Sequence, residues 1–338
     1  METKTVQVMG AGSPIVDLVA EIDDSILTSV QGEKGGMELV DADTLKSLES
    51  LLAEIPIKAP GGSAANTIFA LARMGMACSF LGKLGRDENG IYYKNEFKSL
   101  GGDCSSFKHD DKNVTACCLS LVTPDSERTM RTHLGAAMTL APDDIKDSDF
   151  INCRHVHVEG YLLFNPDLLT AVLKSARNAE CSVSLDLGSF EVVRSAEKIL
   201  PDLLADYVDM VFANEDEAAA FCNDTDPEKG LEALGRLCRI SAVKIGKDGS
   251  WLKQGNQVVH VPAIPVDDAV DTTGAGDFWA SGFLFGYLNG YSLNTCGKIG
   301  SVLGKHVVRH FGANLPASAW EAVQTETRSL LENERKAI

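Results

Sequence analysis

The chain has 338 residues, of which 44% are hydrophobic, and a formal net charge of −17 at pH 7. A chain of this length and apolar content can bury a full core, whereas its negative charge argues against nucleic acid or an anionic membrane surface as a partner. The nine cysteines are an odd number without a C-x-x-C pair, which indicates free thiols in a reducing compartment. With no signal-peptide core and no apolar run of membrane-spanning length, we expect a cytoplasmic protein.

The N-terminal strand ends in two closely spaced glycines. The apolar strand candidate Val6–Met9 runs into Gly10-Ala11-Gly12, and a G-x-G opening can bind a dinucleotide. A third glycine is missing, however, and Pro14 falls where the helix of a Rossmann fold would begin. The chain continues instead as a second, alternating strand to Ile22, so we disfavour the dinucleotide interpretation. A polar helix candidate, a glycine-rich loop and an amphipathic helix (Asp43–Leu52) follow.

A glycine-rich segment, Pro60–Thr67, opens a helix that continues to Gly75. Small residues follow Gly62, so another group can pack against the N-terminus of this helix, and Asn66 would project from its first turns. Ser63 as the N-cap of an ordinary helix explains the same residues. Both interpretations remain open at this point.

Two strands joined by a turn are predicted between Val114 and Thr132, where residues alternate and are rich in β-branched types. The turn spans residues 123–127, and Arg128 follows it directly. A solvated strand charge is one interpretation of this arginine.

A strand between Asp149 and Tyr161 places His155, His157 and Glu159 on one face, because alternate residues of a strand share a face. Such a group could bind a metal ion, but neighbouring ligands on a flat strand seldom suffice, and no further His or Cys cluster supports them. We therefore expect ordinary strand residues beside a pocket.

The second half of the chain alternates between helix and strand. The expected order is helix 167–180, strand 182–186, helix 189–204, strand 208–212, helix 215–222, helix 227–238 and strand 242–245. Strands separated by helix-length segments indicate βα units and a mainly parallel sheet. No internal repeat or linker interrupts this alternation.

The segment Asp271–Asp277 reads Asp-Thr-Thr-Gly-Ala-Gly-Asp and joins an extended segment, 262–270, to an apolar helix, 278–288. Its small residues let a ligand approach the backbone, and the first N–H groups of a helix have no intrahelical partner, so the turn is suited to binding an anion. Asp277 would be useful there as the base that takes a proton from a hydroxyl attacking a phosphate. A glycine-rich cap with a favourable first-turn acid is the simpler alternative.

This heptad, followed by Phe-Trp-Ala-Ser-Gly, resembles the second signature of the ribokinase-like (PfkB) carbohydrate kinase family. The block Pro60–Gly90 resembles the first signature, and the two occur in the family's order. Lys34–Val40, Glu127–Arg131 and Leu134–Ala137 resemble the adenosine-kinase-like branch and related sugar kinases.

The resemblance implies a doubly wound α/β fold, with a mainly parallel sheet flanked by helices and a small β-sheet lid. One kinase domain would cover residues 1–338, and the lid would be formed by segments near 13–40 and 110–135. Exposed lid strands in this family often pair between two copies, which predicts a homodimer through the lid.

The resemblance also assigns residues to the phosphoryl-transfer site. Asp277 would be the catalytic base, and three backbone amides together with a lid arginine would bind the transferring phosphate: Gly274, Ala275, Gly276 and Arg128. Arg131 competes with Arg128 for the arginine role. The sugar would be held by Asp17, Gly61, Gly62 and Asn66.

On the nucleotide side, the resemblance implies contacts from Asn214, Lys244, Gly246, Gly249 and Gly304. Asn214 and Glu217 match the N-x-x-E element that organises magnesium and phosphate through water, although Asn214 would serve equally as a helix N-cap. The family more often has Thr where Lys244 stands, which leaves the contact of this side chain open. Asp271 and Thr273 would bind a monovalent cation such as K⁺, partly through their backbone carbonyl groups.

The expected activity is therefore ATP- and Mg²⁺-dependent phosphorylation of a primary hydroxymethyl group of a sugar or nucleoside. Ribosyl substrates such as adenosine or ribose come first, and a fructose- or ketogluconate-type sugar is the alternative. Phosphorylated sugars rank lower, because no extra basic cluster lies near Asp17 or Asn66. A non-catalytic sugar or nucleoside sensor is the alternative from another class, disfavoured because a sensor has no need of the base. No Walker G-x-x-x-x-G-K-[ST] occurs, which excludes a P-loop kinase.

Overall fold

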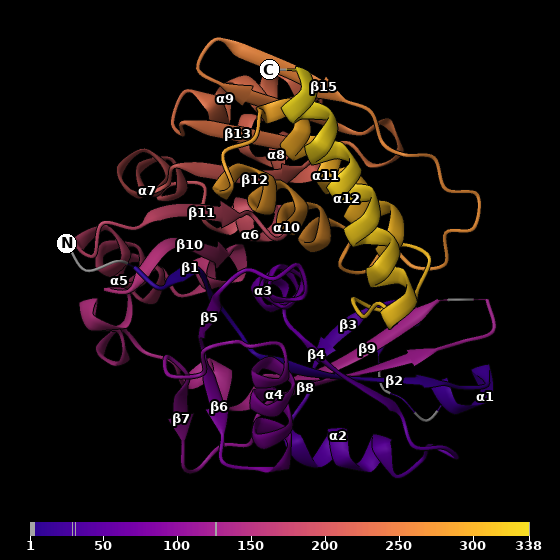
Figure 1. Ribbon diagram of the computed structural model, residues 1–338. Helices are drawn as coiled ribbons and strands as arrows, with labels where there is room; N and C mark the ends of the chain where they lie inside the picture. Colours follow the sequence, from indigo (N-terminus) through magenta and orange to yellow (C-terminus); the bar gives the residue numbers. More distant parts are fainter. Residues whose placement is uncertain (1–3, 29, 31, 126, 338) are drawn as a thin grey trace.

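Short apolar strands build an eight-stranded sheet, which crosses the upper part of the molecule in Figure 1. The computed structural model describes residues 4–28, 30, 32–125 and 127–337. From edge to edge the strands are β15 (Gln257–Val261), β14 (Ser250–Gln254), β13 (Ile240–Lys244), β12 (Met210–Asn214), β11 (Ser182–Asp186), β10 (Cys153–Glu159), β1 (Val6–Ala11) and β5 (Cys78–Leu81). Neighbouring strands from β13 to β5 are parallel, while β13, β14 and β15 pair in antiparallel fashion at one edge.

Helices connect these strands and cover the sheet (Figure 1). In chain order they are α1 (Asp24–Leu27), α2 (Ala42–Glu49), α3 (Ser63–Arg73), α4 (Glu88–Ser99), α5 (Pro166–Asn178), α6 (Phe190–Ser195), α7 (Leu200–Tyr207), α8 (Glu215–Cys222), α9 (Pro227–Gly235), α10 (Ala275–Leu288), α11 (Leu293–Val307) and α12 (Ala317–Ala337). Short 3₁₀ helices lie at Gly135–Thr139, Pro142–Asp144, Asp147–Asp149, Gly160–Phe164 and Gly246–Asp248.

Both faces of the main sheet are buried, because successive side chains of a strand point to opposite faces. In β12, Phe212 packs in the cluster that contains α3 and α10, whereas Val211 packs in the cluster that contains α5, α7 and α9. Such two-sided burial requires continuous apolar runs, as the strand sequences show. The predicted doubly wound α/β fold is confirmed.

A second, five-stranded sheet lies beside the main one, at the lower right in Figure 1. The amphipathic helix α2 covers one face, where Leu45 and Leu48 join the buried residues Leu18 and Leu119. The order of its strands is β3 (Met37–Leu39), β9 (Arg128–His133), β8 (Ala116–Val122), β2 (Ile15–Glu21) and β4 (Ile57–Gly61); a separate pair is formed by β6 (Lys83–Gly85) and β7 (Lys108–Asp110).

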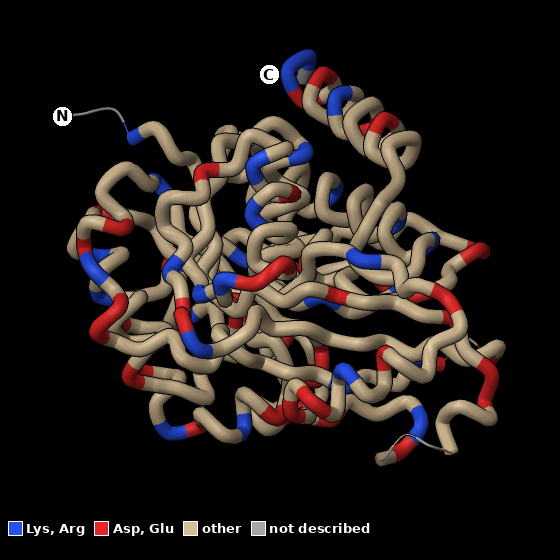
Figure 2. The backbone as a smooth tube through the Cα atoms, turned by 90° about the horizontal axis from the view of Figure 1, so that it is seen from below, with Lys and Arg blue, Asp and Glu red and all other residues tan. Residues whose placement is uncertain are grey.

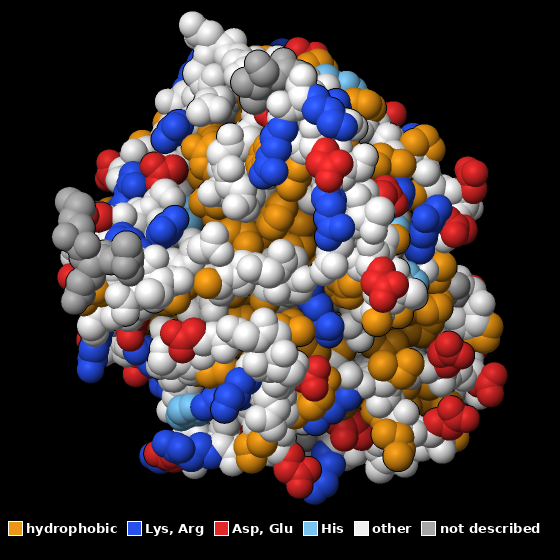
Figure 3. All heavy atoms as spheres, viewed as in Figure 1, with side chains coloured by type: hydrophobic (Ala, Val, Ile, Leu, Met, Phe, Trp, Pro, Cys, Tyr) orange, Lys and Arg blue, Asp and Glu red, His pale blue; other side chains and the backbone are white. Residues whose placement is uncertain are grey.

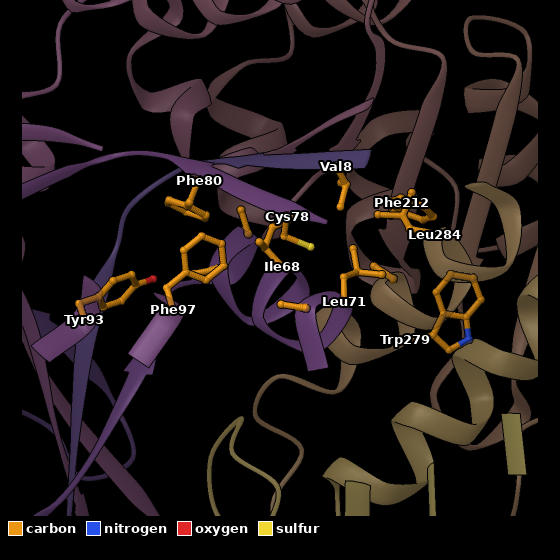
Figure 4. Packing of buried hydrophobic residues seen from close by; sticks show 14 of the residues in the cluster. Val8, Ile68, Leu71, Cys78, Phe80, Tyr93, Phe97, Phe212, Trp279 and Leu284 are labelled. Carbon is orange, nitrogen blue, oxygen red and sulfur yellow. The ribbon is translucent and has the colours of Figure 1, made fainter. Parts of the chain in front are cut away.

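Helix α10 packs between α3 and α11 and carries much of the core on its side of the sheet. Figure 4 shows its Trp279 and Leu284 beside Phe212 of β12, and next to them the side chains of α3 and β5. Glycines let α10 and α11 approach closely, because a Cβ atom at Gly282 would lie 2.7 Å from the amide nitrogen of Gly300. This contact explains why the apolar run of α10 is spaced by glycines.

Two expectations about single elements differ from the structure. The helix predicted over residues 189–204 is divided into α6 and α7, because Pro201 lies in the first turn of α7 and a proline cannot continue a helix from the preceding turn. The segment 262–270, predicted as extended, contains no strand and runs as a loop to the start of α10.

The charged residues are spread over the whole fold, and Figure 2 shows acidic and basic segments interspersed along the chain. In the described part of the chain, no helix is both long and apolar enough to cross a membrane.

Candidate active site

Asp277 lies in the first turn of α10, and two side chains from the first turn of α3 hold its carboxylate. The Ser63 hydroxyl donates to Oδ1 at 2.9 Å, and Nδ2 of Asn66 donates to Oδ2 at 2.8 Å. Thr67 also donates a hydrogen bond to the Asp277 carbonyl oxygen, at 3.0 Å. The N-termini of two helices that are distant in sequence are thereby joined around one carboxylate.

The environment of Asp277 disfavours its charged form. Its pKa is raised to about 7, first by burial and then by the neighbouring Asp186 carboxylate, although the hydrogen bonds from Asn66 and Ser63 oppose the shift. A carboxyl group that titrates near neutral pH is well matched to general base catalysis.

The loop before Asp277 has the backbone of an anion site. Gly274 is the N-cap of α10 with φ of 75°, and a Cβ atom there would lie 2.7 Å from the Cβ of Ala313. The N–H of Ala275 donates to the carbonyl oxygen of Thr272 at 3.1 Å, so this predicted anion-hole amide is engaged. The amide of Gly276 follows in the first helical turn, where no intrahelical carbonyl is in reach.

The residues predicted to bind the sugar form a continuous wall next to Asp277. Gly61 ends β4 beside Asp17 of β2, and a Cβ atom at Gly61 would overlap with the Asp17 carboxylate. Gly62 then caps α3 with φ of 103°, a conformation that favours glycine. Burial raises the pKa of Asp17 to about 7, and the positive charge of Arg128 opposes the shift.

Asn66 has one further property that suits a binding role. Its Nδ2 is used by Asp277, but its Oδ1 is buried without a hydrogen-bond partner in the described structure. A buried, unpaired acceptor is costly, and a substrate hydroxyl could satisfy it.

The structure separates the two candidate arginines of β9. Arg128 donates from Nη1 to Oδ2 of Asp271 at 2.5 Å and to the Thr273 hydroxyl at 2.8 Å, so it reaches the loop before the base. Its Nε is buried without a partner in the described structure. Arg131, an odd number of residues further on, points to the opposite face, is 1% exposed and donates to the carbonyl oxygens of Gly36 and Met130.

Asp271 does not have a free carboxylate for a monovalent cation. Oδ1 accepts from the backbone and hydroxyl of Thr273, and Oδ2 accepts from Arg128 and from the amide of Gly312. Burial works against ionisation, but the hydrogen bonds from Gly312 and Thr273 and the charge of Arg128 hold the pKa of Asp271 below its usual value. A cation at this carboxylate would have to displace Arg128, so we derive no step through it.

A cavity of about 650 Å³ adjoins Asp277 on the side of the main sheet. It is of the size of a small-molecule site. The loop 263–269 and α11 complete its walls, and it is lined by all the residues predicted to contact the nucleotide: Asn214, Lys244, Gly246, Gly249 and Gly304.

Asn214 and Glu217 interact with one another at the N-terminus of α8. The Asn214 side chain accepts from the amide of Glu217 at 2.8 Å, while Glu217 accepts from both the backbone and the side chain of Asn214. This is a reciprocal capping box, and burial raises the pKa of Glu217 to about 7. The described residues include no cluster of three or more potential metal ligands; a carboxylate that faces the cavity nevertheless fits Mg²⁺, which retains several waters and binds mainly substrate phosphates.

Two residues of the site were missed from the sequence. The sequence predicts Ser63 only as a helix cap, but Gly62 takes the N-cap position and the Ser63 hydroxyl donates a hydrogen bond to Asp277. Asp186, which pairs with Lys244 at 2.9 Å, lies at the end of β11. Its position at the carboxyl end of a parallel strand, where ligands bind in such sheets, was the available signal.

The strand β10 carries three polar residues that are hydrogen-bonded within the fold: His155, His157 and Glu159. Each histidine is buried and bonds to serine hydroxyls of β11 at 2.8 Å, and burial lowers the pKa of His155 to about 3 and that of His157 to about 4. Glu159 accepts from the amides of Ser13 and Ala64. It thus ties the β1–β2 turn to α3, and Gly12 is small because a Cβ atom there would overlap with this carboxylate.

Comparisons with known proteins show the family to which the chain belongs. Residues 40–320 match the pfkB family carbohydrate kinase. The crystal structure of adenosine kinase from Sinorhizobium meliloti is 33% identical, with a TM-score of 0.83 over 95% of this chain and 99% of that chain. A probable sugar kinase from Rhizobium etli is 30% identical, with a TM-score of 0.84 over 97% and 100%. ATP-dependent ribose-1-phosphate kinase of Halopiger xanaduensis is 32% identical over 228 residues, 68% of this chain and 73% of that protein.

The fold and the site therefore define a ribokinase-like phosphotransferase. The chain belongs to the pfkB family of carbohydrate kinases and is an ATP-dependent kinase.

Proposed function

We propose that the protein transfers the γ-phosphate of ATP to the primary hydroxyl group of a nucleoside. The observation that carries the proposal is the position of Asp277. Its carboxylate is fixed by α3 next to the sugar-binding wall of Asp17 and Gly61, and it borders the cavity on the other side. A hydroxyl held on one side and a phosphate held on the other would meet at this base.

In the proposed reaction, Asp277 takes the proton of the hydroxyl as the oxygen attacks phosphorus. The amide of Gly276 and the guanidinium of Arg128 bind the phosphoryl oxygens, whose charge is spread out in the transition state. Magnesium, held through water near Asn214 and Glu217, would shield the charge of the ATP phosphates. The hydroxyl must compete with water, so closure of the five-stranded sheet over the substrate would favour transfer.

The open face of the five-stranded sheet is the face that α2 does not cover, and it carries Asp17. This face favours a neutral substrate with an apolar part. Residues paired across strands share a face, and the pairs Asp17–Cys118, Cys118–Thr132 and Ser120–Met130 define the face that carries Asp17. Met37 and Leu39 continue it at the edge and are 55% and 61% exposed. Figure 3 shows apolar side chains gathered at the lower right, over this sheet. A nucleoside base could pack there.

The charges on the same face argue against a phosphorylated sugar. The lysines and arginines of the five strands are Lys58, Arg128 and Arg131. Lys58 lies over the ring of Tyr92, and Arg131 points to the opposite face with Glu38. Arg128 alone remains for the open face, and it is needed for the transferring phosphate.

A coupled ADP-release assay with Mg²⁺ and ATP tests the proposal. The acceptors are adenosine, other nucleosides, ribose, ribose 1-phosphate, fructose and ketogluconate, with a reaction without acceptor as the control. We expect the highest kcat/KM for a nucleoside. A higher kcat/KM for ribose 1-phosphate or a free sugar would contradict the nucleoside assignment, and ADP release that no acceptor stimulates would contradict the kinase proposal.

Three further expectations also belong to this proposal. Repeating the assay in potassium, sodium and choline salts measures any need for K⁺.

A homodimer through the edges of the five-stranded sheet would be supported by exposed Met37, Leu39 and Ile57, and light scattering measures its mass. The nine free cysteines support a reducing, cytoplasmic location.

A further inference from the structure

Lys244 lies in the cavity between the Asp186 carboxylate and the first turn of α10. It ends β13, and its Nζ donates to Oδ2 of Asp186 at 2.9 Å. The side chains of the pair are 14% and 7% exposed. The same Nζ lies 3.0 Å from the position that a Cβ atom of Gly276 would occupy. The ammonium group therefore sits directly against the first turn of α10.

The ammonium group also has unused hydrogen-bonding capacity. A lysine Nζ carries three N–H donors, and Asp186 is its one hydrogen-bond acceptor among the described residues. Two N–H groups are thus left beside a cavity that opens to Gly276 and Asp277. A buried donor without an acceptor is costly, so a ligand oxygen at this place would be bound favourably.

The other lysines that line the cavity are differently placed. Lys305 is bonded through Nζ to both carboxylate oxygens of Glu326 at 2.8 and 2.7 Å. Lys247 is exposed. Lys244 is thus the cavity lysine that combines burial, free donors and contact with the anion-binding turn.

We propose that Lys244 binds the transferring phosphoryl group directly and that Asp186 is the residue that positions it; the proposal rests on the kinase function above. Lys244 would approach the phosphate from the main sheet, while Arg128 approaches the same loop from the five-stranded sheet. Two cations would then hold the charge that develops on the phosphoryl oxygens. A Cβ atom at Gly276 would make a tight contact with the ammonium group, at 3.0 Å.

A competing explanation is that Lys244 only neutralises Asp186. The two explanations differ in which nucleotides are affected by loss of the lysine charge. If Lys244 contacts the terminal phosphate, loss of its charge weakens the binding of ATP analogues alone. If its role is purely structural, the loss weakens the binding of all adenine nucleotides equally, or of none.

Calorimetric titration with AMP-PNP and with AMP, both in the presence of Mg²⁺, separates these explanations. The variants are Lys244→Gln, Lys244→Arg and, as a second neutral change, Lys244→Thr, which has the residue more frequent in the family. The control is Lys253→Gln, because the Lys253 side chain is as little exposed as that of Lys244, at 13%, and also forms an ion pair at 2.9 Å, with the 48% exposed Glu232, but lies outside the cavity. The melting temperature of each variant reports folding.

We expect Lys244→Gln and Lys244→Thr to weaken AMP-PNP binding about 10- to 100-fold and to leave AMP binding within about twofold of wild type. Lys244→Arg should recover part of the affinity and of kcat, and Lys253→Gln should bind AMP-PNP as wild type does. Equal losses for both nucleotides, or no loss in folded Lys244→Thr, would overturn the proposal. A wild-type protein that binds AMP-PNP but phosphorylates none of the acceptors contradicts the proposed function instead, and leaves the Lys244 comparison readable.

Discussion

Asp277, the proposed catalytic base, has a pKa that is set by its surroundings. Burial and the Asp186 carboxylate raise its pKa to about 7, while two hydrogen bonds keep it from rising further. As the base, Asp277 would act in its charged form, because only a carboxylate can accept the hydroxyl proton. The fraction of active enzyme would therefore fall when the pH drops below this pKa.

This gives a pH prediction. With a saturating nucleoside and Mg²⁺-ATP, kcat should be level above about pH 8 and should fall by about tenfold per unit well below about pH 7. Measured affinity for AMP-PNP at each pH is the control, because loss of nucleotide binding would imitate the effect. A kcat that stays constant down to about pH 5.5 would show that Asp277 has an ordinary pKa or is not the base.

Around Asp277, some features of the site could be predicted from the sequence and others could not. The heptad Asp271–Asp277 predicted the glycine turn and the place of Asp277 in the first turn of the following helix, because the backbone requirements of such a turn are local. The donors on Asp277 could not be assigned in the same way. Ser63 and Asn66 reach it only after α3 and α10 pack together, and the local letters around Ser63 fit a helix cap equally well.

At the scale of elements, Glu159 joins three parts of the fold that position the site. It lies at the end of β10 and accepts hydrogen bonds from the β1–β2 turn and from the first turn of α3. The small residue at Gly12 makes room for it. The two glycines that suggested a dinucleotide site therefore have a packing explanation, since Gly10 likewise makes room for Ile68 and Phe80.

A substitution at Gly12 tests this explanation. Gly12→Ala should lower the free energy of unfolding by about 1–3 kcal/mol, because the added methyl group overlaps with a buried carboxylate. The comparison is Gly304→Ala in the last turn of α11, where no atom outside the neighbouring backbone lies within 4 Å of the added Cβ. A helical Gly→Ala change there should raise the free energy of unfolding by up to about 1 kcal/mol. Urea unfolding measures both. Equal stability of the Gly12 variant and wild type would contradict the packing explanation.

Periodicity predicted most elements of the main sheet, but not every boundary. The strand 182–186 and the helix 215–222 coincide with β11 and α8. The break between α6 and α7 was missed because apolar spacing continues across it, although Pro201 marks the start of a new helix. A single proline changes the apolar periodicity of sixteen residues very little, but it prevents α6 and α7 from forming one continuous helix.

At the scale of the whole molecule, the two sheets meet at Asp277 from opposite sides. The five-stranded sheet contributes Asp17 and Arg128, and the main sheet contributes Asp186 and Lys244. The ion pair Arg128–Asp271 directly links β9 to the loop before α10, with side chains that are 11% and 9% exposed. Removing it should loosen the five-stranded sheet and leave the main sheet unchanged.

Hydrogen–deuterium exchange measures this effect. Arg128→Met should accelerate amide exchange in β8, β9 and the loop 271–277 without changing exchange in β11 and β12. The matched control is Arg309→Met, because the pair Arg309–Asp268 is far more exposed, at 35% and 68%, and exposed pairs contribute little. Similar exchange in β9 of both variants would contradict a linking role for Arg128.

The assembly of the site from two sheets also explains why Arg128 and Arg131 could not be separated from the sequence alone. Both lie on β9, and the choice depends on which face of the strand is directed to the site. That face is fixed by the pairing of β9 with β8 and β3 and by the packing of α2 against the other side. Such pairing joins segments that are far apart in the chain.

The most direct test of the account is ADP release by Asp277→Asn. The introduced carboxamide can keep both contacts, because its carbonyl oxygen can accept from Asn66 and its amide can donate to the Ser63 hydroxyl, so the fold should be retained. We predict that turnover with a nucleoside falls by at least about 10³-fold while AMP-PNP still binds. Turnover near the wild-type rate would contradict the assignment of Asp277 as the base.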